Sequence, residues 1–416
     1  MGPALRVGMS ASLASVGLAS VALASVGLAL AGCGATRSGP APIPVVVSAP
    51  IGTEPWIGGF NVHGAQLSIE AINAAGGVTV GGVRHTLVLD VEDNQGSPQQ
   101  AVSIARKAVA EHALAIITDG IGAPAVSKIT DTANLPVFIT YDGGGSLVDA
   151  ATMPTVFRIA PADKYMGPRL ADYIAGQHPK IALITEDSSF GQDGRTAVLG
   201  GLRTDQLKVV DDVTVPSEAT DLSTQVGQAR SRGATLLVLW LHGTGIAAVL
   251  SAARAAGWQA PVYAGPDGED PIVRQLLANH PDWVSGLTFI AGRITSETGP
   301  APFAAFRSAY EKRFGIDRIG VSNVVSPPDY AMYAADAVSL VAAAATSAGA
   351  LGAPLMAAMG TTVITGANGD ERGFTVPDGR EGVVPDDMYF ARYRGLRFYP
   401  VTDDIIGPQH LPYVPQ

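Results

Sequence analysis

Acidic and aromatic side chains follow several apolar segments of this chain. In parallel α/β sheets, ligands bind in loops after the carboxyl ends of strands. Loops of this kind follow Val47, Thr118, Thr140, Thr185, Leu241 and Tyr263. Their acidic, aromatic and imidazole side chains are Trp56, Asp119, Tyr141, Asp142, Asp187, Phe190, His242, Asp267 and Glu269. Glycines such as Gly120 and Gly143 let backbone amides approach a ligand closely. We expect a binding site for a small polar molecule.

Each candidate residue also has a structural interpretation. Asp119 could cap the helix that follows it, and Asp142 and Asp267 have the sequence context of turn residues. Trp56, like Phe190, could pack in a core, but it lies in a Gly/Pro loop and not on a periodic face, which favours the cleft. A single histidine at a strand end, as at position 242, is more often structural. Tyr330 and Tyr333 are expected to pack.

The composition offers little support for catalysis. The seven histidines are not paired at metal-ligand spacing, and the chain has no Gly-x-Ser-x-Gly elbow and no phosphate-loop lysine motif. The clustered acids could form an acid/base pair, but no nucleophile or metal site accompanies them. We therefore expect a binding protein without cofactor or metal, and not an enzyme.

Apolar runs alternate with amphipathic segments, which predicts an α/β fold with parallel central sheets covered on both faces. Strands are expected at 44–48, 87–91, 114–118, 137–140, 180–185, 209–215, 235–241 and 262–263, with helices between them. Two such sets exceed one core, which predicts two lobes. The first would comprise 44–158 and 292–360, the second 159–291 and 361–416, with crossings near 157–161 and 287–293.

The first 32 residues predict an export signal, because one charge, Arg6, precedes an uncharged apolar run. A single membrane span is the alternative. The run ends in LAGC at 30–33, which resembles a bacterial lipobox and implies a lipid on Cys33, the only cysteine. Residues 33–43 would be a flexible tether. This predicts a protein anchored by its lipid to the outer face of the cell membrane. A net charge of −10 argues against a nucleic-acid partner.

Six phrases carry a family resemblance over residues 44–400. They are GAQLSIEAINAAGG at 64–77, SPQQA at 97–101 after DN at 93–94, VFRIAP at 156–161, EDSSFG at 186–191, AGPDG at 264–268 and YAMYAADA at 330–337. Their order and spacing resemble the type I periplasmic solute-binding proteins, in the branch that binds branched-chain amino acids. The resemblance implies two Rossmann-like lobes, a hinge, a ligand cleft between the lobes, and an ABC permease with cytosolic ATPases as partner.

The resemblance also implies roles for single residues. Asp267 would meet the ligand's amino group, Phe190 would cover the ligand, and the family's other aromatic positions fall near Trp56 and His242. The family holds a carboxylate with small hydroxyl residues in two loops of the first lobe. Here those loops contain glycine, and Asp119 and Asp142 are additional.

Two like charges would disfavour a carboxylate ligand, by about 1–4 kcal/mol each at about 4 Å. The sequence therefore predicts an uncharged polar or amine-bearing ligand. A tethered sensor, whose ligand binding is read by a signalling membrane protein, remains the alternative to transport.

The anchor is directly testable. We expect Cys33→Ala to release the protein from membranes or to leave it unprocessed, because the alanine has no thiol to acylate. Palmitate labelling followed by membrane fractionation measures this. Labelling of the unmodified sequence at a site other than Cys33, or none, would contradict it.

Overall fold

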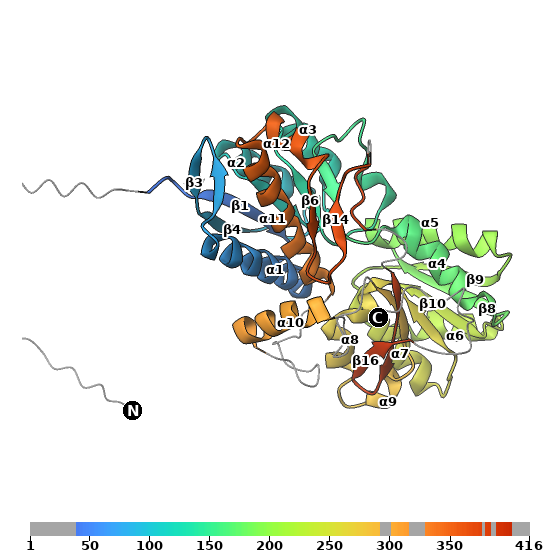
Figure 1. The fold of residues 1–416 in the computed structure, drawn as a ribbon. Coiled ribbons are helices and arrows are strands. Elements are labelled where there is room, and N and C mark those ends of the chain that lie inside the picture. The colour runs from blue at the N-terminus through green and yellow to red at the C-terminus, as the bar shows by residue number, and fades with distance from the viewer. Residues whose placement is uncertain (1–38, 292–300, 316–328, 377–378, 384–387, 402–416) are drawn as a thin grey trace, which may run out of the picture. The chain divides into compact units, whose positions relative to one another are not determined.

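The computed structural model describes residues 39–291, 301–315, 329–376, 379–383 and 388–401. The predicted signal peptide, Cys33 and most of the predicted tether lie outside these residues. From Pro40 onward, the strands form two large sheets with helices packed against them (Figure 1).

The first sheet is parallel and has five strands in the order β4-β1-β5-β6-β7. Its strands are β1 (Ile43–Ala49), β4 (Leu87–Asp93), β5 (Ala115–Thr118), β6 (Val137–Ile139) and β7 (Val156–Arg158). Its helices are α1 (Pro55–Ala74), α2 (Pro98–Ala110), α3 (Ala123–Ala133), α11 (Asp329–Ala348) and α12 (Ala353–Met359), with one 3-10 turn, η1 (Gly145–Leu147).

Strand β1 explains why this sheet is covered on both faces. Val45 and Val47 point into the core formed with α1 and α11, while Val46 points into the core formed with α2 and α3. All three side chains are fully buried. A continuous apolar run, as predicted for this segment, is therefore the pattern that a two-sided core requires.

The second sheet has seven strands in the order β16-β15-β12-β11-β10-β8-β9. They are β8 (Lys180–Glu186), β9 (Lys208–Val215), β10 (Leu236–Trp240), β11 (Val262–Ala264), β12 (Thr288–Ala291), β15 (Tyr389–Arg394) and β16 (Arg397–Pro400). Only β15 and β16 run antiparallel to their neighbours. Its helices are α4 (Asp163–Ala175), α5 (Ser189–Thr204), α6 (Ser223–Ser231), α7 (Gly243–Ala255), α8 (Pro271–Leu276) and α9 (Pro281–Val284), with the turn η2 (Pro266–Glu269).

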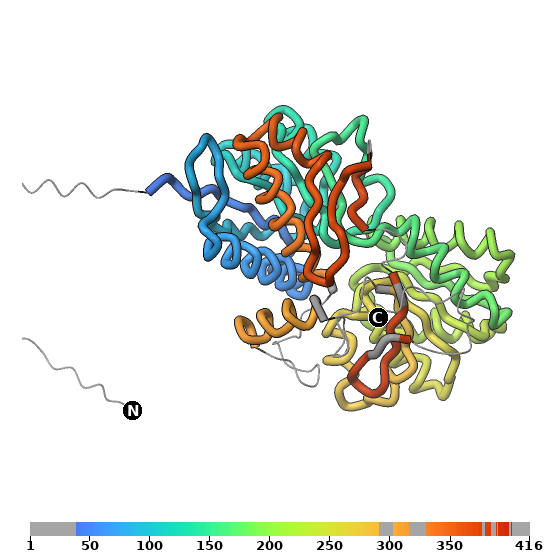
Figure 2. The backbone as a smooth tube through the Cα atoms, in the orientation of Figure 1, coloured from blue at the N-terminus to red at the C-terminus, as the bar shows by residue number. Residues whose placement is uncertain are grey.

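We call the first sheet with its helices the first lobe, and the second sheet with its helices the second lobe. The chain builds the first lobe, continues into the second, adds α11 and α12 to the first and then returns to the second at β15 and β16 (Figure 2). Helix α10 (Ala301–Phe314) contacts α1. The fold class expected from the sequence is therefore confirmed, with two lobes built on mostly parallel sheets.

The predicted boundary between the lobes needs one adjustment. The hairpin of β13 (Val363–Thr365) and β14 (Glu371–Gly373) packs on α11, and Arg372 lies 3.4 Å from Asp336 of that helix. We propose that this hairpin belongs to the first lobe, whereas the sequence had assigned everything after 360 to the second. A second small hairpin, β2 (Val78–Val80) and β3 (Val83–His85), was not predicted.

Local signals place the helix ends correctly in one case and wrongly in another. The predicted cap at Ser97 is present, since its hydroxyl accepts a hydrogen bond from the Gln100 amide at 3.4 Å. Trp56 was expected in a loop, but it lies in the first turn of α1. Pro55 at the first helical position accounts for the difference, because its ring is preorganised for helix and begins α1 earlier than the apolar periodicity indicated.

Helix α11 is long and apolar enough to span a membrane by length and composition alone. Most of its apolar window, 72%, is buried inside the protein. It also packs against helix α1, so in this structure it is a core helix.

The contact between α1 and α11 depends on glycine. A Cβ added at Gly64 would lie 2.1 Å from the Ala331 carbonyl oxygen of α11. We expect Gly64→Ala to lower the free energy of unfolding by about 2 kcal/mol, as overpacked cores do. Urea unfolding measures the change.

Gly59 of the same helix is the matched control, because a Cβ there would meet no atom within 4 Å. Gly59→Ala should raise stability by up to about 1 kcal/mol through helix propensity. Equal effects of the two substitutions would contradict the close-packing explanation.

Candidate functional site

A pocket of about 740 Å³ is lined by residues of both lobes. The first lobe contributes the start of α1 and the residues before it, 53–56. The second contributes the segments that follow β8, β9, β10 and η2. The pocket therefore lies among loops at the carboxyl ends of strands, where ligands bind in such sheets.

Aromatic rings connect the two lobes beside this pocket. The Trp56 and Tyr141 rings meet edge to face with centroids 6.1 Å apart, and Tyr141 stacks on Phe190 of α5 at 5.9 Å. Phe190 in turn lies 4.8 Å from the His242 ring, which precedes α7. Four of the predicted site residues thus form one continuous column, of which Trp56 and His242 line the pocket.

A hydrogen bond from Tyr141 to Asp267 joins the lobes directly. The Tyr141 hydroxyl donates to Asp267 Oδ1 at 2.5 Å, and both side chains are buried. Burial raises the pKa of Asp267 to about 7, although His242 and the Tyr141 hydroxyl act to lower it.

His242 lies between two acids. Its Nδ1 is 3.4 Å from both Asp267 Oδ2 and Glu186 Oε1, and its amide donates to Glu186 Oε2 at 2.7 Å. Burial acts to lower the pKa of His242, but the surrounding carboxylates of Asp267, Glu186 and Glu54 outweigh it and raise the pKa. The imidazole is therefore held towards its charged form.

Acids outnumber bases around the pocket. The wall contains Glu54, Glu186, Glu218 and Asp270, and its only basic side chain among the described residues is His242. Burial raises the pKa of Asp270 to about 8, with the charge of Asp267 adding to the effect. Such a pocket favours a cation or a hydrogen-bond donor over an anion.

Asp119 and Gly120 do not line the pocket. The Asp119 carboxylate is buried in the first lobe, where it accepts hydrogen bonds from the Asn94 amide at 2.7 Å and the Thr118 hydroxyl at 3.2 Å. Gly120 has φ of +121°, and a Cβ there would lie 2.9 Å from Asp142 Cβ. Asp119 therefore makes structural contacts, but it does not cap the helix that follows it.

Asp142 forms a turn with its own loop. Its Oδ1 accepts a hydrogen bond from the Gly144 amide at 2.9 Å. This is the turn that the sequence left open as the structural interpretation of Asp142. A Cβ at Gly143 would lie 2.1 Å from Asp163 Oδ1 of α4, so only glycine fits between the loop and the second lobe. Neither residue lines the pocket.

None of the four acids of the pocket wall, Glu54, Glu186, Glu218 and Asp270, was among the site residues predicted from the sequence. Glu186 is the last residue of β8 and is buried, whereas the predicted site residue next to it, Asp187, accepts a hydrogen bond from the Ser217 amide near the surface. The alternation of strand side chains distinguishes the two, but only once the end of the strand is known.

A family model described as periplasmic binding protein matches residues 57–396. Among curated proteins, the chain is 25% identical over 279 residues to Leu/Ile/Val-binding protein homolog 7 of Brucella melitensis, covering 62% of this chain and 67% of the relative. The homologous protein of Brucella suis is 27% identical over 281 residues, with the same coverage.

Solved structures share the fold. One is the branched-chain amino acid transporter substrate-binding protein LivJ of Streptococcus pneumoniae in complex with isoleucine, with a TM-score of 0.72 and 19% identity over 86% of this chain and 97% of that one. Another is an ABC transporter solute-binding protein of Rhodopseudomonas palustris with 3,4-dihydroxybenzoic acid, with a TM-score of 0.71 and 18% identity over 88% and 99%. The resemblance inferred from the sequence is confirmed.

The buried Asp119 carboxyl makes stability depend on pH. Burial, followed by the charge of Asp142, raises its pKa from 3.8 to about 7, despite the hydrogen bonds from Asn94 and Thr118. The folded state thus keeps a proton that the unfolded state has lost between these values, and rising pH favours unfolding.

We expect Asp119→Asn to remove this dependence while its side-chain oxygen still accepts from Asn94. The variant's advantage should grow as the pH rises from about 4 through 7, up to about 4 kcal/mol at pH 8. Urea unfolding at pH 4 and pH 8 measures it. Parallel pH profiles for the two proteins would contradict the assignment.

Proposed function

Since this chain belongs to the periplasmic binding protein family, we propose that it binds a small polar molecule between its two lobes outside the cytoplasm. In this proposal it delivers the molecule to an ABC permease and catalyses no reaction. Proteins of this family and those with similar structures are solute-binding proteins, which in general are not enzymes.

The observation that carries the proposal is the pocket of about 740 Å³ with walls from both lobes. Its volume suits a small metabolite. Trp56 offers a ring from the first lobe, and Asp270 offers a carboxylate from the second. A ligand in contact with both walls would stabilise the closed arrangement of the lobes.

The cell-surface part of the proposal rests on the sequence LAGC at 30–33. A lipid on Cys33 would hold the binding lobes at the membrane where a permease operates. A sensor that passes the bound state to a signalling membrane protein has the same requirements for tether and pocket, and it remains the second candidate. Genes for a permease and ATPases beside the coding region would support transport.

The acids of the pocket favour an amine-bearing ligand. Proteins of similar structure hold isoleucine or 3,4-dihydroxybenzoic acid, and both of these carry a carboxylate. The described wall of this pocket has no lysine or arginine to pair with one. We propose that Asp270 of the wall accepts the ligand's amino group, with Trp56 beside its apolar part, while the buried Asp267 behind the wall adds negative charge.

A thermal-shift screen with leucinamide, putrescine, leucine, isoleucine and benzoate tests this proposal. A ligand that binds only the folded state raises stability by about 2.7 kcal/mol at 100 times its Kd. We expect leucinamide or putrescine to raise Tm and benzoate to have no effect. Binding of benzoate without binding of any amine would contradict the ligand class, and no shift with any compound would count against the proposed function.

Asp267 should matter more for amines than Asp119 does. We expect Asp267→Asn to weaken leucinamide binding by about 1–4 kcal/mol, because a negative charge close to the ligand's amino group is lost. Titration calorimetry measures the change. Asp119→Asn is the matched control, since its carboxylate is bound to Asn94 away from the pocket. Equal losses in the two variants would contradict the role of Asp267.

A further inference from the structure

Arg158 links two of the segments by which the chain passes between the lobes. It is the last residue of β7, just before the chain enters the second lobe at α4, and its side chain is 1% exposed. Its Nε and Nη2 donate to the two carboxylate oxygens of Glu381 at 2.9 and 2.8 Å. Glu381 belongs to the later segment, which pairs with the Arg158 backbone on the way to β15.

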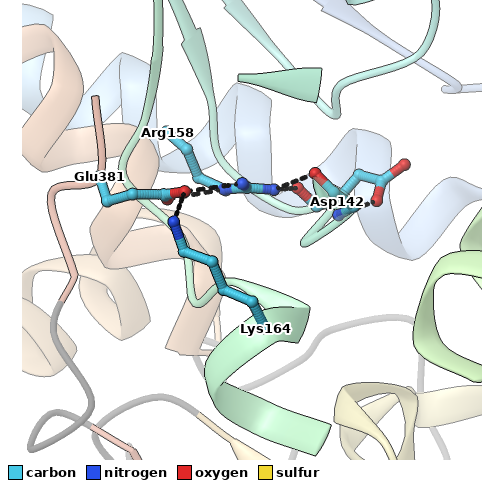
Figure 3. A network of polar contacts seen from close by, with 5 residues as sticks. Asp142, Arg158, Lys164 and Glu381 are labelled. Atoms are coloured by element: carbon cyan, nitrogen blue, oxygen red, sulfur yellow. Dashed lines mark hydrogen bonds and ion pairs between the residues drawn. The ribbon is translucent and has the colours of Figure 1, made fainter. Parts of the chain in front are cut away.

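The remaining arm of the guanidinium holds the loop after β6. Arg158 Nη1 donates to the Gly144 carbonyl at 2.8 Å and to the Asp142 carbonyl at 3.1 Å (Figure 3). The planar guanidinium has five donors in a fixed fork, so its grip on Glu381 also determines the direction of Nη1. Lys164 of α4 reaches the same carboxylate, with Nζ 3.0 Å from Glu381 Oε1.

Main-chain hydrogen bonds also hold this loop, from the Asp142 amide to the Asp119 carbonyl at 2.8 Å and from the Asp163 amide to the Gly143 carbonyl at 2.9 Å, but Arg158 is the side chain that binds two of its carbonyls. The loop contains three consecutive glycines, 143–145, whose backbones are unusually free. It also lies against the second lobe, since a Cβ at Gly144 would be 2.2 Å from Asp193 Oδ2. The residue immediately before Asp142 is Tyr141, whose hydroxyl meets Asp267 across the lobes.

We infer that Arg158 is a positioning residue for ligand binding. It fixes the loop 142–144 through two carbonyls and thereby directs Tyr141 to Asp267, while Glu381 orients the guanidinium from the returning segment. This inference rests on the proposed function, because the role of Arg158 is defined by ligand binding between the lobes. Arg158 would thereby couple the segments that join the lobes to the position of Tyr141 beside the pocket.

Arg158→Lys is the informative substitution, because it keeps the charge and removes the fork. Hydrogen exchange of the full chain without ligand, followed by mass spectrometry, measures the loop at residues 141–147. We expect exchange there to be at least about tenfold faster in the variant, since hydrogen bonds to a charged group are lost. Glu381→Gln, which leaves Arg158 in place, should give a smaller increase in the same peptide.

Arg372→Lys is the matched control. Arg372 is also 1% exposed and paired with an acid, Asp336 of α11, but it lies on the β13–β14 hairpin. The Arg372→Lys substitution should reduce overall stability without selectively changing hydrogen exchange at residues 141–147. Lys164→Met, at a half-exposed position, should leave that peptide unchanged. Uniformly faster exchange in both arginine variants would overturn the inference.

A double-mutant cycle separates positioning from plain structural support. Arg158→Lys and Tyr141→Phe are combined, because phenylalanine lacks the hydroxyl that binds Asp267, and urea unfolding of the four proteins is compared. If Arg158 acts through Tyr141, the double variant loses less stability than the sum of the singles, whereas Arg372→Lys with Tyr141→Phe is additive. Additivity in both cycles would overturn the inference. If Arg158→Lys does not fold, Glu381→Gln takes its place in the cycle.

Neither measurement uses a ligand. A failed ligand screen would therefore count against the proposed function and leave this result standing. If the ligand screen finds a ligand but the double-mutant cycle is additive, the role of Arg158 is contradicted and the proposed function is not.

Discussion

Burial of carboxylates without an equal number of buried cations is the constraint on which this structure depends. Asp119, Asp163, Asp267 and Asp270 are all desolvated, and burial is the main cause that raises the pKa of each. A desolvated carboxylate is tolerated only when it is neutral, hydrogen-bonded or paired. The last two face the meeting point of the lobes, so the desolvation that stabilises the neutral acids also prepares the pocket for a positively charged or donating ligand.

Among the described residues, the two fully buried arginines show two ways of meeting this constraint. Arg372 lies beside Asp336 and serves the packing of the hairpin on α11. Arg158 binds Glu381 with two nitrogens and still has a third for main-chain carbonyls. Although burial acts to raise it, Arg158 and Lys164 hold the pKa of Glu381 below its ordinary value. The same residue type therefore stabilises one lobe in the first case and joins separate segments in the second.

The sequence predicts the fold well because strands buried on both faces leave an unmistakable apolar pattern, as at Val45, Val46 and Val47. It predicts part of the site. Tyr141, Phe190, His242 and Asp267 come together because strand ends converge in a parallel sheet. It could not reveal that Asn94, from another loop, binds Asp119, since that contact depends on the distance between two strand ends. It also could not choose Glu186 over Asp187, because that choice depends on where β8 ends.

The glycines that face the second lobe have a consequence for the entropy of closing the cleft. Long side chains at an interface lose rotamer freedom when they become ordered, by up to about 2 kcal/mol each. At Gly143 and Gly144 the first lobe presents only main chain to Asp163 and Asp193, so no rotamers are lost on its side. The backbone freedom of this loop is already restricted on folding, because Arg158 binds its carbonyls. A ligand entering the pocket would therefore meet a loop with little disorder left to lose.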